Sequence, residues 1–490
     1  MHDSDPFFLP PTDLLPTDPL PVDPDAPYLL TVSPPGDPRF GPILYQLHSL
    51  FLRAGPLQSR FSWWLYTSVP LYIVFAQAYI LVGGKKGTRP IRAALAAAYV
   101  SLTLYNVMTY RIVDLRLNLW NTALLLLIMQ VGIQSVEFGL LKDPINDPYM
   151  HFHKRRRIVA AYDLILNQRM LSLGAVGLDV GAGPPNAVIN KLDGPQIERQ
   201  YSLSRPMPPR PKTRFGAVLR HLGHTLRAYL ILDIMMGLSQ VATSPEWSAI
   251  RGGTLPAEAD MIDKLAAKNH FTLFPGTLNI PISSWGIGYT TSYACNICVW
   301  VGFTFAYHIQ AALTIASGLW EPSSWDLDLF FHPWFADSVL DFWGRRWHQI
   351  LRHHFNILSM ATINILGLPI SSYTIIPLTF FWSGMLHALA GLNMHPAPSP
   401  WPLAGFFFAQ ALGSCAEVAF KRYTGVRVGG WWGMIYCQLF MMLTGRAAAN
   451  SWIDAGLAGA TVTAPYGIGR IIAPYILKSE RILSAVPSMN

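Results

Sequence analysis

The sequence predicts an all-α protein that crosses a membrane many times, with about eight to ten transmembrane helices. Only 13% of the 490 residues are charged, against roughly 25% in an ordinary soluble domain, and 51% are hydrophobic. Several uncharged runs approach the length of about 20 residues that a helix needs to cross the hydrocarbon core. Composition therefore excludes a disordered chain and a repeat solenoid.

Residues 1–40 are predicted to form a disordered tail ahead of the membrane domain. The first 38 residues contain eleven Pro and seven Asp but no Lys or Arg. Such a segment cannot bury a core, and it lacks the basic start of a secretory signal. The remainder, residues 41–490, is predicted to be a single membrane domain without internal repeats.

The predicted helices follow the apolar stretches along the chain. Three spans are expected at residues 62–83, 93–110 and 117–136, a fourth at 228–242 and a fifth within 285–319. The uncharged run 357–391 is interrupted by Gly367 and Pro369, which predicts a short buried helix followed by a true span. Further helices are expected at 402–420, at 429–443 and after Ala447.

Positively charged residues are concentrated in the connections between these stretches. The connection around Lys85 and Arg89, the long connection 142–222 and the segment 320–355 are all basic. The positive-inside rule places such connections in the cytosol. Membrane orientation thus explains the net charge of +8, and no nucleic-acid partner is expected.

The most unusual connection has the sequence DFWGRRWHQILRHH at residues 341–354. If it forms one helix, four polar side chains lie within about 60° of one another: Asp341, Arg345, His348 and Arg352. The tryptophans fall on the other face. Two interpretations remain open, an interfacial anchor or a polar stripe that faces a cavity. A metal site built from its histidines is disfavoured, because no carboxylate or thiolate lies at ligand spacing beside them.

His387 ends the sequence SGMLH, which lies inside an apolar run. An imidazole is costly in hydrocarbon, so it is expected to face the protein interior or a wet cavity. Ser383, Gly384 and Gly391 share its helix face, and these small residues leave room for a ligand. The alternative is that His387 only bonds a neighbouring helix and that the small residues only permit close helix packing.

Three other polar groups lie within apolar runs, namely Asp233, His308 and Glu417. Each is a candidate functional group, because ionisable side chains inside a membrane are costly. Glu417 precedes Lys421 by four residues, a spacing that favours an ion pair near a helix end. We expect a structural or supporting role for all three.

The two strongest segments together resemble the wax-synthase domain of the membrane-bound O-acyltransferase (MBOAT) superfamily. The similarity rests on DFWGRRWHQ at residues 341–349, preceded by Ser338, and on SGMLH at 383–387 near the end of an apolar helix. Weaker similarity begins at YDLILNQRM, residues 162–170, where fungal members usually continue with Arg-Gly and this chain has Met170. The resemblance implies an MBOAT-like helical fold.

The resemblance also implies an enzyme that transfers an acyl group from acyl-coenzyme A to a hydroxyl group of a hydrophobic alcohol. His387 matches the buried histidine of this family that acts as general base, within a catalytic region at residues 320–391. His348 matches the position of a second polar catalytic residue. Either His348 or Gln349 is expected to stabilise the oxyanion that forms during transfer.

Binding roles are expected for the remaining residues of the two segments. Coenzyme A is polyanionic and cytosolic, so its phosphates are expected to meet Arg345, Arg346 and Arg352. Contacts with substrate are expected for Asp341, Trp347, Gln349, Ser383 and Gly384. No metal or bound cofactor is expected; acyl-coenzyme A is a co-substrate, and the alcohol is expected to enter from the lipid bilayer.

Fungal members of the family include acetyltransferases of terpenoid and meroterpenoid secondary metabolism. The resemblance therefore favours acetyl-coenzyme A as donor and a terpenoid-like alcohol as acceptor, in the membrane of the endoplasmic reticulum. A long-chain-alcohol O-fatty-acyltransferase, or wax ester synthase, is the alternative. The sequence does not indicate an oligomeric state.

Other classes of membrane protein remain as alternatives. A prenyltransferase or cyclase needs paired acidic clusters that hold magnesium and diphosphate, and neither Asp143 with Asp147 nor Asp326 with Asp328 forms such a pair. A transporter is expected to show repeats and broken helices related between two halves, which are not evident here. A membrane scaffold without catalytic activity is the third alternative.

Overall fold

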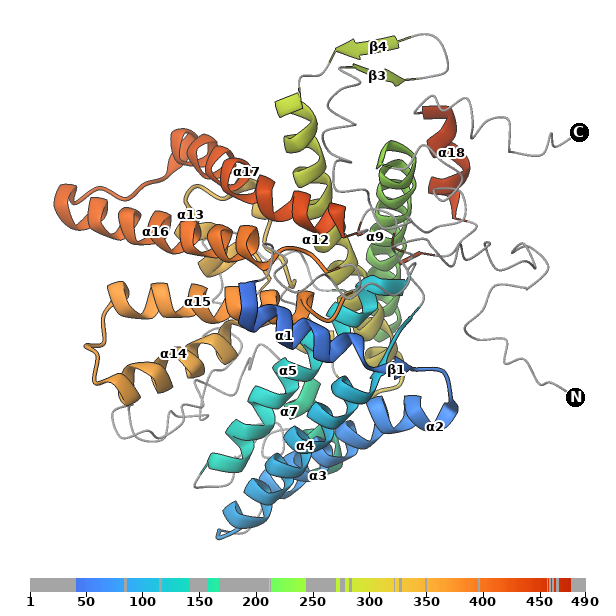
Figure 1. Ribbon diagram of the computed structural model, residues 1–490, viewed down its shortest axis with the longest axis vertical. Coiled ribbons are helices and arrows are strands. Elements are labelled where there is room, and N and C mark those ends of the chain that lie inside the picture. The colour runs from blue at the N-terminus through green and yellow to red at the C-terminus, as the bar shows by residue number, and fades with distance from the viewer. Residues whose placement is uncertain are drawn as a thin grey trace, which may run out of the picture.

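Helices dominate the architecture of the chain (Figure 1). The computed structural model describes residues 41–82, 86–113, 117–141, 157–166, 213–243, 270–273, 278–281, 284–320, 322–325, 328–348, 350–394, 397–455 and 467–476, with isolated positions between 211 and 463. The predicted tail, Lys85, most of the connection 142–222 and Gln349 lie outside these residues.

The first part of the chain forms a group of packed helices. Its elements are α1 Gly41–Leu52, α2 Arg60–Trp63, the π-helical turn η2 Trp64–Ser68, α3 Val69–Leu81, α4 Arg89–Thr109, α5 Asn118–Leu140 and α7 Arg157–Leu166. Two short parallel strands, β1 Gly55–Pro56 and β2 Tyr110–Arg111, pair beside it. Its buried core includes Val74, Tyr99 and Phe138.

A polar network inside this group fixes α3, α4 and α5 relative to one another. The Gln77 amide nitrogen donates to the backbone carbonyls of Arg92 and Ser135, at 2.7 and 2.9 Å. The fully buried Arg92 guanidinium donates to the carbonyls of Phe138 and Leu141 at the end of α5. The two bonds from Arg92 satisfy carbonyls at the end of α5 that would otherwise lack a partner in the membrane.

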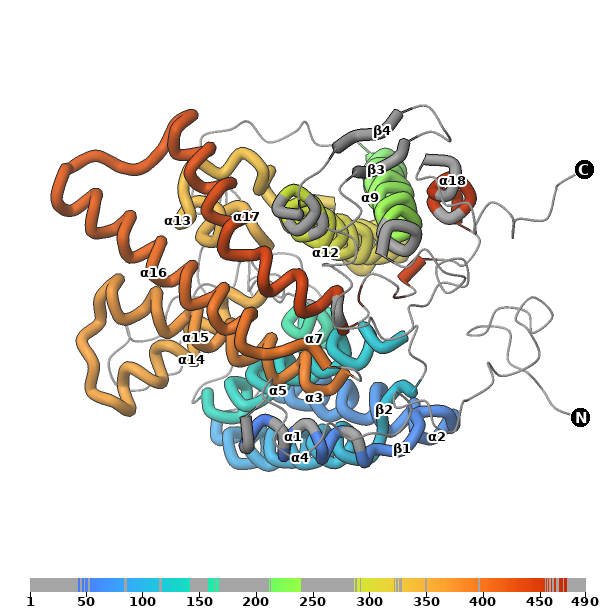
Figure 2. The backbone as a smooth tube through the Cα atoms, turned by 45° about the horizontal axis from the view of Figure 1, so that its top comes forward, coloured from blue at the N-terminus to red at the C-terminus, as the bar shows by residue number. Residues whose placement is uncertain are grey.

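A second group consists of two long helices that lie side by side. These are α9 Arg214–Thr243 and α12 Ser284–Ala316, with α18 Ile468–Ile476 packed against α9 (Figure 2). The strands β3 His270–Leu273 and β4 Leu278–Pro281 form an antiparallel hairpin.

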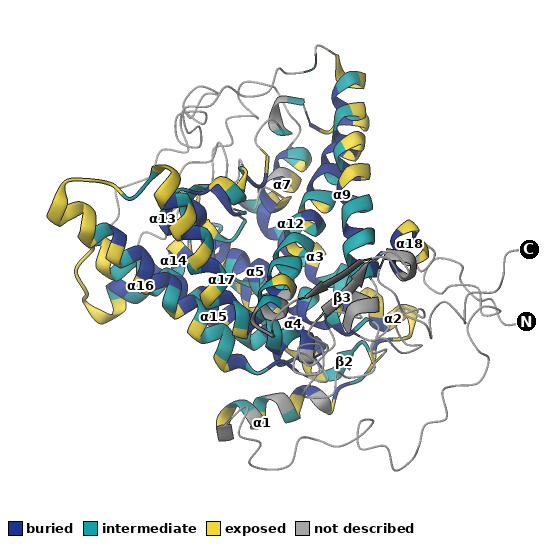
Figure 3. Cartoon of the chain, turned by 90° about the horizontal axis from the view of Figure 1, so that it is seen from above, coloured by how far each residue is buried: buried dark blue, intermediate teal, exposed yellow. Residues whose placement is uncertain are grey.

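The third group carries both segments that the sequence singles out. Its elements are the short helices η5 Pro322–Trp325, η6 Pro333–Phe335 and α13 Val339–Asp341, the π-helical turn η7 Phe342–Arg346, and the helices α14 Arg352–Leu366, α15 Ser372–Gly391, α16 Pro400–Thr424 and α17 Gly430–Asp454. The last four helices stack on one side of the molecule (Figure 1). Figure 3 shows buried residues concentrated where the three groups meet.

The prediction of a helical membrane protein is confirmed. Among the described residues, six helical stretches are long and apolar enough to span a membrane: Arg60–Leu81, Arg89–Thr109, Asn118–Leu140, Ser292–Ala316, Ser372–Gly391 and Pro400–Thr424. Helices α9 and α17 also form where spans are expected, but they are not among these six. Helix α17 runs through Ala447, and the helix after it, α18, has only nine residues.

The expected division of residues 357–391 is also confirmed, and it positions the site. Helix α14 ends at Gly367, whose φ of +63° a residue with a side chain rarely adopts. Ser371 then forms a capping box that starts α15. Because α14 and α15 pack together as a hairpin, the residues before α14 and the last turns of α15 lie at the same end.

Candidate active site

His387 lies in the last two turns of α15, half-buried within the protein. Its Nδ1 atom is 2.7 Å from the backbone carbonyl oxygen of Ser383. A carbonyl oxygen only accepts hydrogen bonds, so Nδ1 carries the proton. In a neutral imidazole, Nε2 is then the nitrogen with a free lone pair, and it is available to accept a proton.

The helix face around His387 is filled by α16. The Phe407 ring lies 5.2 Å from the His387 ring, between centroids. A Cβ added at Gly384 would be 3.3 Å from the Phe407 Cβ, and one added at Gly391 would be 3.0 Å from Pro398. The expectation that Gly384 and Gly391 leave room for a ligand is therefore wrong, because these glycines admit neighbouring side chains.

His348 lies just before α14 in an aromatic surrounding. Its ring is 5.1 Å from Phe303 on α12, 5.7 Å from Phe330 and 5.6 Å from Trp347, measured between ring centroids. Its Nδ1 atom is buried and has no hydrogen-bond partner in the described part of the chain. A polar atom held this way gains a partner when a ligand or water binds beside it.

The two predicted catalytic histidines influence each other electrostatically. Burial, and to a smaller extent the neighbouring His387, lower the pKa of His348 to about 3. His348 is therefore neutral at physiological pH. The α14–α15 hairpin brings together two residues that are 39 positions apart in the sequence.

The segment 341–354 is not the single helix that the sequence predicts. After α13, the turn η7 is π-helical, with the Trp347 amide donating to the Phe342 carbonyl. Trp347 is extended, with φ −72° and ψ 157°, and it ends the helix there. Asp341, Arg345, His348 and Arg352 therefore do not share one helix face.

The π-helical turn directs two arginines to one carboxylate. Asp341 is buried and pairs with Arg345 at 3.1 Å and with Arg346 through a short contact. Arg346 is itself buried and also donates to the carbonyls of Phe331 and His332. The structure thus places Asp341 and Arg346 in an internal ion pair, which differs from the expected contacts with substrate and coenzyme A.

The other expected binding residues have different surroundings. Trp347 is buried and stacks on Phe342, with 5.2 Å between ring centroids. Arg352 is exposed and donates to the Gly344 carbonyl at 3.1 Å. Gln349 lies outside the described residues.

Glu417 holds the start of this segment in place. Its carboxylate oxygens accept hydrogen bonds from the backbone amides of Val339, at 2.7 Å, and Leu340, at 3.0 Å. These amides belong to the first turn of α13, where a helix leaves its N–H groups without partners. The expected supporting role is thus filled by a cap on α13, and not by an ion pair with Lys421.

The other two intramembrane polar groups join helices. The His308 Nδ1 atom lies 2.8 Å from Nδ1 of His221, so α12 and α9 share a hydrogen bond between imidazoles. Asp233 accepts a hydrogen bond of 2.7 Å from the Gly469 amide of α18. These contacts fit the structural roles expected for both residues.

Sequence reasoning missed a hydrogen-bonded histidine–glutamate pair beside the site. The Nε2 atom of His353 lies 2.9 and 3.0 Å from the two carboxylate oxygens of Glu137 on α5. Glu137 directly follows the predicted span 117–136, so a carboxylate at that boundary was the available signal. Phe407 was also missed, since it is one of three consecutive phenylalanines in an apolar run.

The six candidate spans define an integral membrane protein, and two buried or half-buried histidines, one before α14 and one near the end of α15, form a candidate catalytic pair. Residues 325–409 match the Membrane bound O-acyl transferase family. The resemblance seen in the sequence is thereby confirmed over the part of the chain that holds both histidines.

Similar proteins include both acetyltransferases and fatty-acyltransferases. An acetyltransferase of Arthrinium sp is 33% identical over 147 residues, which are 27% of this chain and 34% of that protein. An acyl-CoA–sterol O-acyltransferase of Arabidopsis thaliana is 32% identical over 128 residues, or 24% and 37% of the two chains. A long-chain-alcohol O-fatty-acyltransferase of Simmondsia chinensis is 25% identical over 138 residues, or 26% and 38%. The similarity spans about a third of the length of these relatives.

Proposed function

We propose that this protein is an acyl-coenzyme A-dependent O-acyltransferase that esterifies a hydrophobic alcohol. The observation that carries the proposal is the hydrogen bond from Nδ1 of His387 to the Ser383 carbonyl. It leaves Nε2 of a half-buried imidazole as a proton acceptor, beside a second neutral histidine, within a segment of an acyltransferase family.

His387 acts as the general base in this proposal. An alcohol is a poor nucleophile near neutral pH, so Nε2 takes the hydroxyl proton while the oxygen attacks the thioester carbonyl. Base catalysis of this kind contributes about 10²- to 10⁴-fold in rate. When the tetrahedral intermediate collapses, the ester forms, the C–S bond breaks, and the His387 imidazolium returns its proton to the leaving thiolate.

His348 stabilises the negative charge that develops on the carbonyl oxygen. It is neutral, so one ring nitrogen carries a proton that it can donate. Its aromatic neighbours exclude water, and a hydrogen bond to an oxyanion is strongest where water is excluded. Gln349 remains a proposed alternative donor.

The donor is held through its phosphates. Arg352 and Arg345 lie in the segment next to His348, and Arg352 is exposed. An exposed guanidinium suits phosphate oxygens, which it can bind through two parallel hydrogen bonds. Arg346 is not included in this role, since its donors are taken by Asp341 and by carbonyls.

An acetyl donor and a terpenoid-like secondary-metabolite alcohol are the favoured substrates in this proposal. The similarity to an acetyltransferase of Arthrinium sp and to another of Rhodocybe pseudopiperita, 32% identical over 131 residues, supports acetyl transfer. The similarity to sterol and long-chain-alcohol acyltransferases supports a hydrophobic hydroxyl acceptor more generally. We place the enzyme in the membrane of the endoplasmic reticulum, with its basic connections in the cytosol.

The test is an ester-forming assay on microsomes that contain the full chain. Radiolabelled acetyl- and palmitoyl-coenzyme A are each offered with sterol, terpenoid and long-chain alcohols, and the labelled esters are separated. We expect acetyl esters of a polycyclic alcohol. Ester formation only from palmitoyl-coenzyme A with long-chain alcohols would support the wax ester synthase instead, and the absence of any ester above control microsomes would contradict the proposal.

A further inference from the structure

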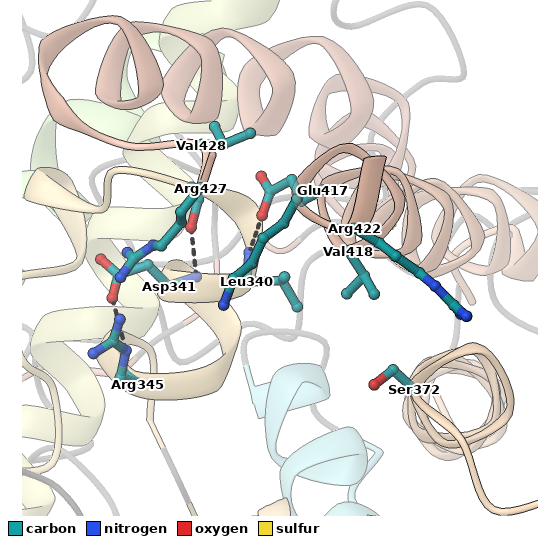
Figure 4. Close-up of a pocket in the computed structure, with 11 residues that line it drawn as sticks. Leu340, Asp341, Arg345, Ser372, Glu417, Val418, Arg422, Arg427 and Val428 are labelled. Atoms are coloured by element: carbon teal, nitrogen blue, oxygen red, sulfur yellow. Dashed lines mark hydrogen bonds and ion pairs between the residues drawn. The ribbon is translucent and has the colours of Figure 1, made fainter. Parts of the chain in front are cut away.

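A cavity of about 550 Å³ lies between α13, the start of α15 and the end of α16. The residues of the cavity argued below are Asp341, Arg345, Ser372, Glu417, Lys421, Arg422 and Arg427 (Figure 4). Neither His387 nor His348 lines it. Ser372 and His387 are 15 residues apart on α15, which corresponds to about 22 Å along a helix.

Cationic side chains outnumber anionic side chains among the residues that line this cavity. Asp341 is engaged by Arg345 and Arg346, and Arg427 pairs with Asp337 at 2.7 Å. Glu417 is occupied by two backbone amides. In the described part of the chain, the side chains of Lys421 and Arg422 have no hydrogen-bonded or ion-paired partner. Two cations therefore remain for an anionic ligand.

The turn from α16 to α17 fixes one wall of this cavity. Gly425 and Gly430 have φ values of +75° and +65°, so the chain reverses tightly between the helices. A side chain at Gly433 would overlap the Asp337 carbonyl, so the turn packs directly against the segment before α13. In Figure 4, Arg422 and Ser372 lie on one side of the cavity, and Asp341 and Arg345 lie on the other.

Exposed aromatic side chains flank the same turn. Tyr423 is 94% exposed, Trp431 77% and Trp432 82%. Helix α16 is a candidate span, so its last turn lies where a spanning helix leaves the hydrocarbon core. Tryptophan and tyrosine concentrate at the depth of lipid headgroups. The two free cations are thus presented at the depth of lipid phosphates.

We propose that this cavity binds the phosphate of an anionic phospholipid, held by Lys421 and Arg422 while Trp431 and Trp432 insert among the headgroups. Arginine binds phosphate oxygens in pairs, and lysine adds a point charge. A juxtamembrane cation contributes about fivefold to affinity for an anionic membrane surface, and the contribution falls as ionic strength rises.

The test measures lipid binding directly. The purified full chain in detergent is titrated with phosphatidic acid or with phosphatidylcholine, and native mass spectrometry counts the lipids that remain bound. We expect tighter binding of phosphatidic acid. The double variant Lys421→Gln/Arg422→Gln should weaken that binding by about 25-fold, from about fivefold for each cation, and leave phosphatidylcholine binding unchanged.

The matched control is Lys86→Gln/Arg89→Gln, which removes two exposed cations, one just before α4 and one at its first residue. It should weaken phosphatidic acid binding far less than Lys421→Gln/Arg422→Gln does, because Lys86 and Arg89 do not line the cavity. Equal losses in both double variants would overturn the proposal, because they would indicate a general charge effect. Displacement of phosphatidic acid by free coenzyme A would overturn it as well, since the phosphate held there would then belong to the acyl donor. The conservative variant Arg422→Lys should retain most of the binding.

Discussion

The Nδ1–H group of His387 donates a hydrogen bond of 2.7 Å to the carbonyl oxygen of Ser383, one helical turn earlier. The helix backbone therefore sets which ring nitrogen carries the proton, without a second side chain such as a carboxylate. Since a carbonyl oxygen is part of the fold, this tautomer is fixed as soon as α15 forms. The base in the proposed reaction is thus prepared before any substrate binds.

Adding a methyl group at Gly384 should disturb the site through Phe407. The new Cβ would be 3.3 Å from the Phe407 Cβ, and Phe407 contacts the His387 ring. We expect Gly384→Ala to lower the free energy of unfolding by about 1–3 kcal/mol and to reduce ester formation. Gly405→Ala on α16 is the control, because nothing lies within 4 Å of the added Cβ. Equal effects of the two variants on activity would argue against this contact.

Arg346 should matter for stability, and Arg352 for donor binding. Arg346→Gln leaves the buried Asp341 with only the partly exposed Arg345, and loss of a buried partner costs about 3–5 kcal/mol. Arg352→Gln should raise the KM for acyl-coenzyme A with little change in thermal unfolding. Thermal melts and donor KM measured on both variants separate the two roles. If Arg346→Gln raised the donor KM without lowering the melting temperature, Arg346 would be a ligand of coenzyme A instead.

Glu417 should stabilise the protein through α13. Glu417→Gln retains one acceptor oxygen and loses the charge that binds the Val339 and Leu340 amides. We expect the free energy of unfolding to fall by about 1–3 kcal/mol. Lys421→Gln should leave it unchanged. Equal losses of stability in the two variants, measured by thermal melts, would contradict this role of Glu417. They would favour an ion pair between Glu417 and Lys421 instead.

His354 should make the protein sensitive to acid. It is fully buried, neither ring nitrogen has a hydrogen-bond partner in the described residues, and burial lowers its pKa to about 3. Between pH 6.5 and 3 the unfolded chain binds a proton that the folded chain does not, so stability falls as pH falls. The loss is about 1.4 kcal/mol for each pH unit.

His354→Leu removes this proton-binding group and fills a similar volume. We expect a flatter dependence of the melting temperature on pH between 6.5 and 4, with equal or greater stability at pH 7. The control is His332→Asn, because His332 is exposed, and Asn tolerates its positive φ of 47°. A pH dependence that is the same in wild type and His354→Leu would exclude His354 as the source.

The length of the apolar runs and the glycines and prolines that interrupt them predict most of the long helices, but not α1 or α7. The interruption at Gly367 and Pro369 correctly divided α14 from α15, because a positive φ and a missing amide end a helix whatever its surroundings. The run 429–443 correctly predicted the start of α17 but not its extension to Asp454. The polar residues beyond Leu443 lie inside α17, which packs against α12 and α16.

The site was predictable as a pair of motifs but not as an arrangement. The cluster of arginines next to His348 predicts a binding site for the phosphates of coenzyme A, whereas the π-helical turn directs Arg345 and Arg346 to Asp341. Such a turn depends on tertiary contacts and has no period of its own in the sequence. The space beside Gly384 also depends on tertiary contacts. The small residues around His387 suggest room for a ligand, but Phe407 of α16 occupies the space next to Gly384.

The most direct test of the central claim is the rate of ester formation per amount of folded protein in His387→Ala and in the control His332→Asn. Both variants are purified, their folding is checked by thermal unfolding, and labelled ester is measured with the substrates found for the wild type. We expect His387→Ala to lose at least about 100-fold in rate, as for removal of a general base, while His332→Asn stays near wild type. A folded His387→Ala protein with wild-type activity would contradict the account.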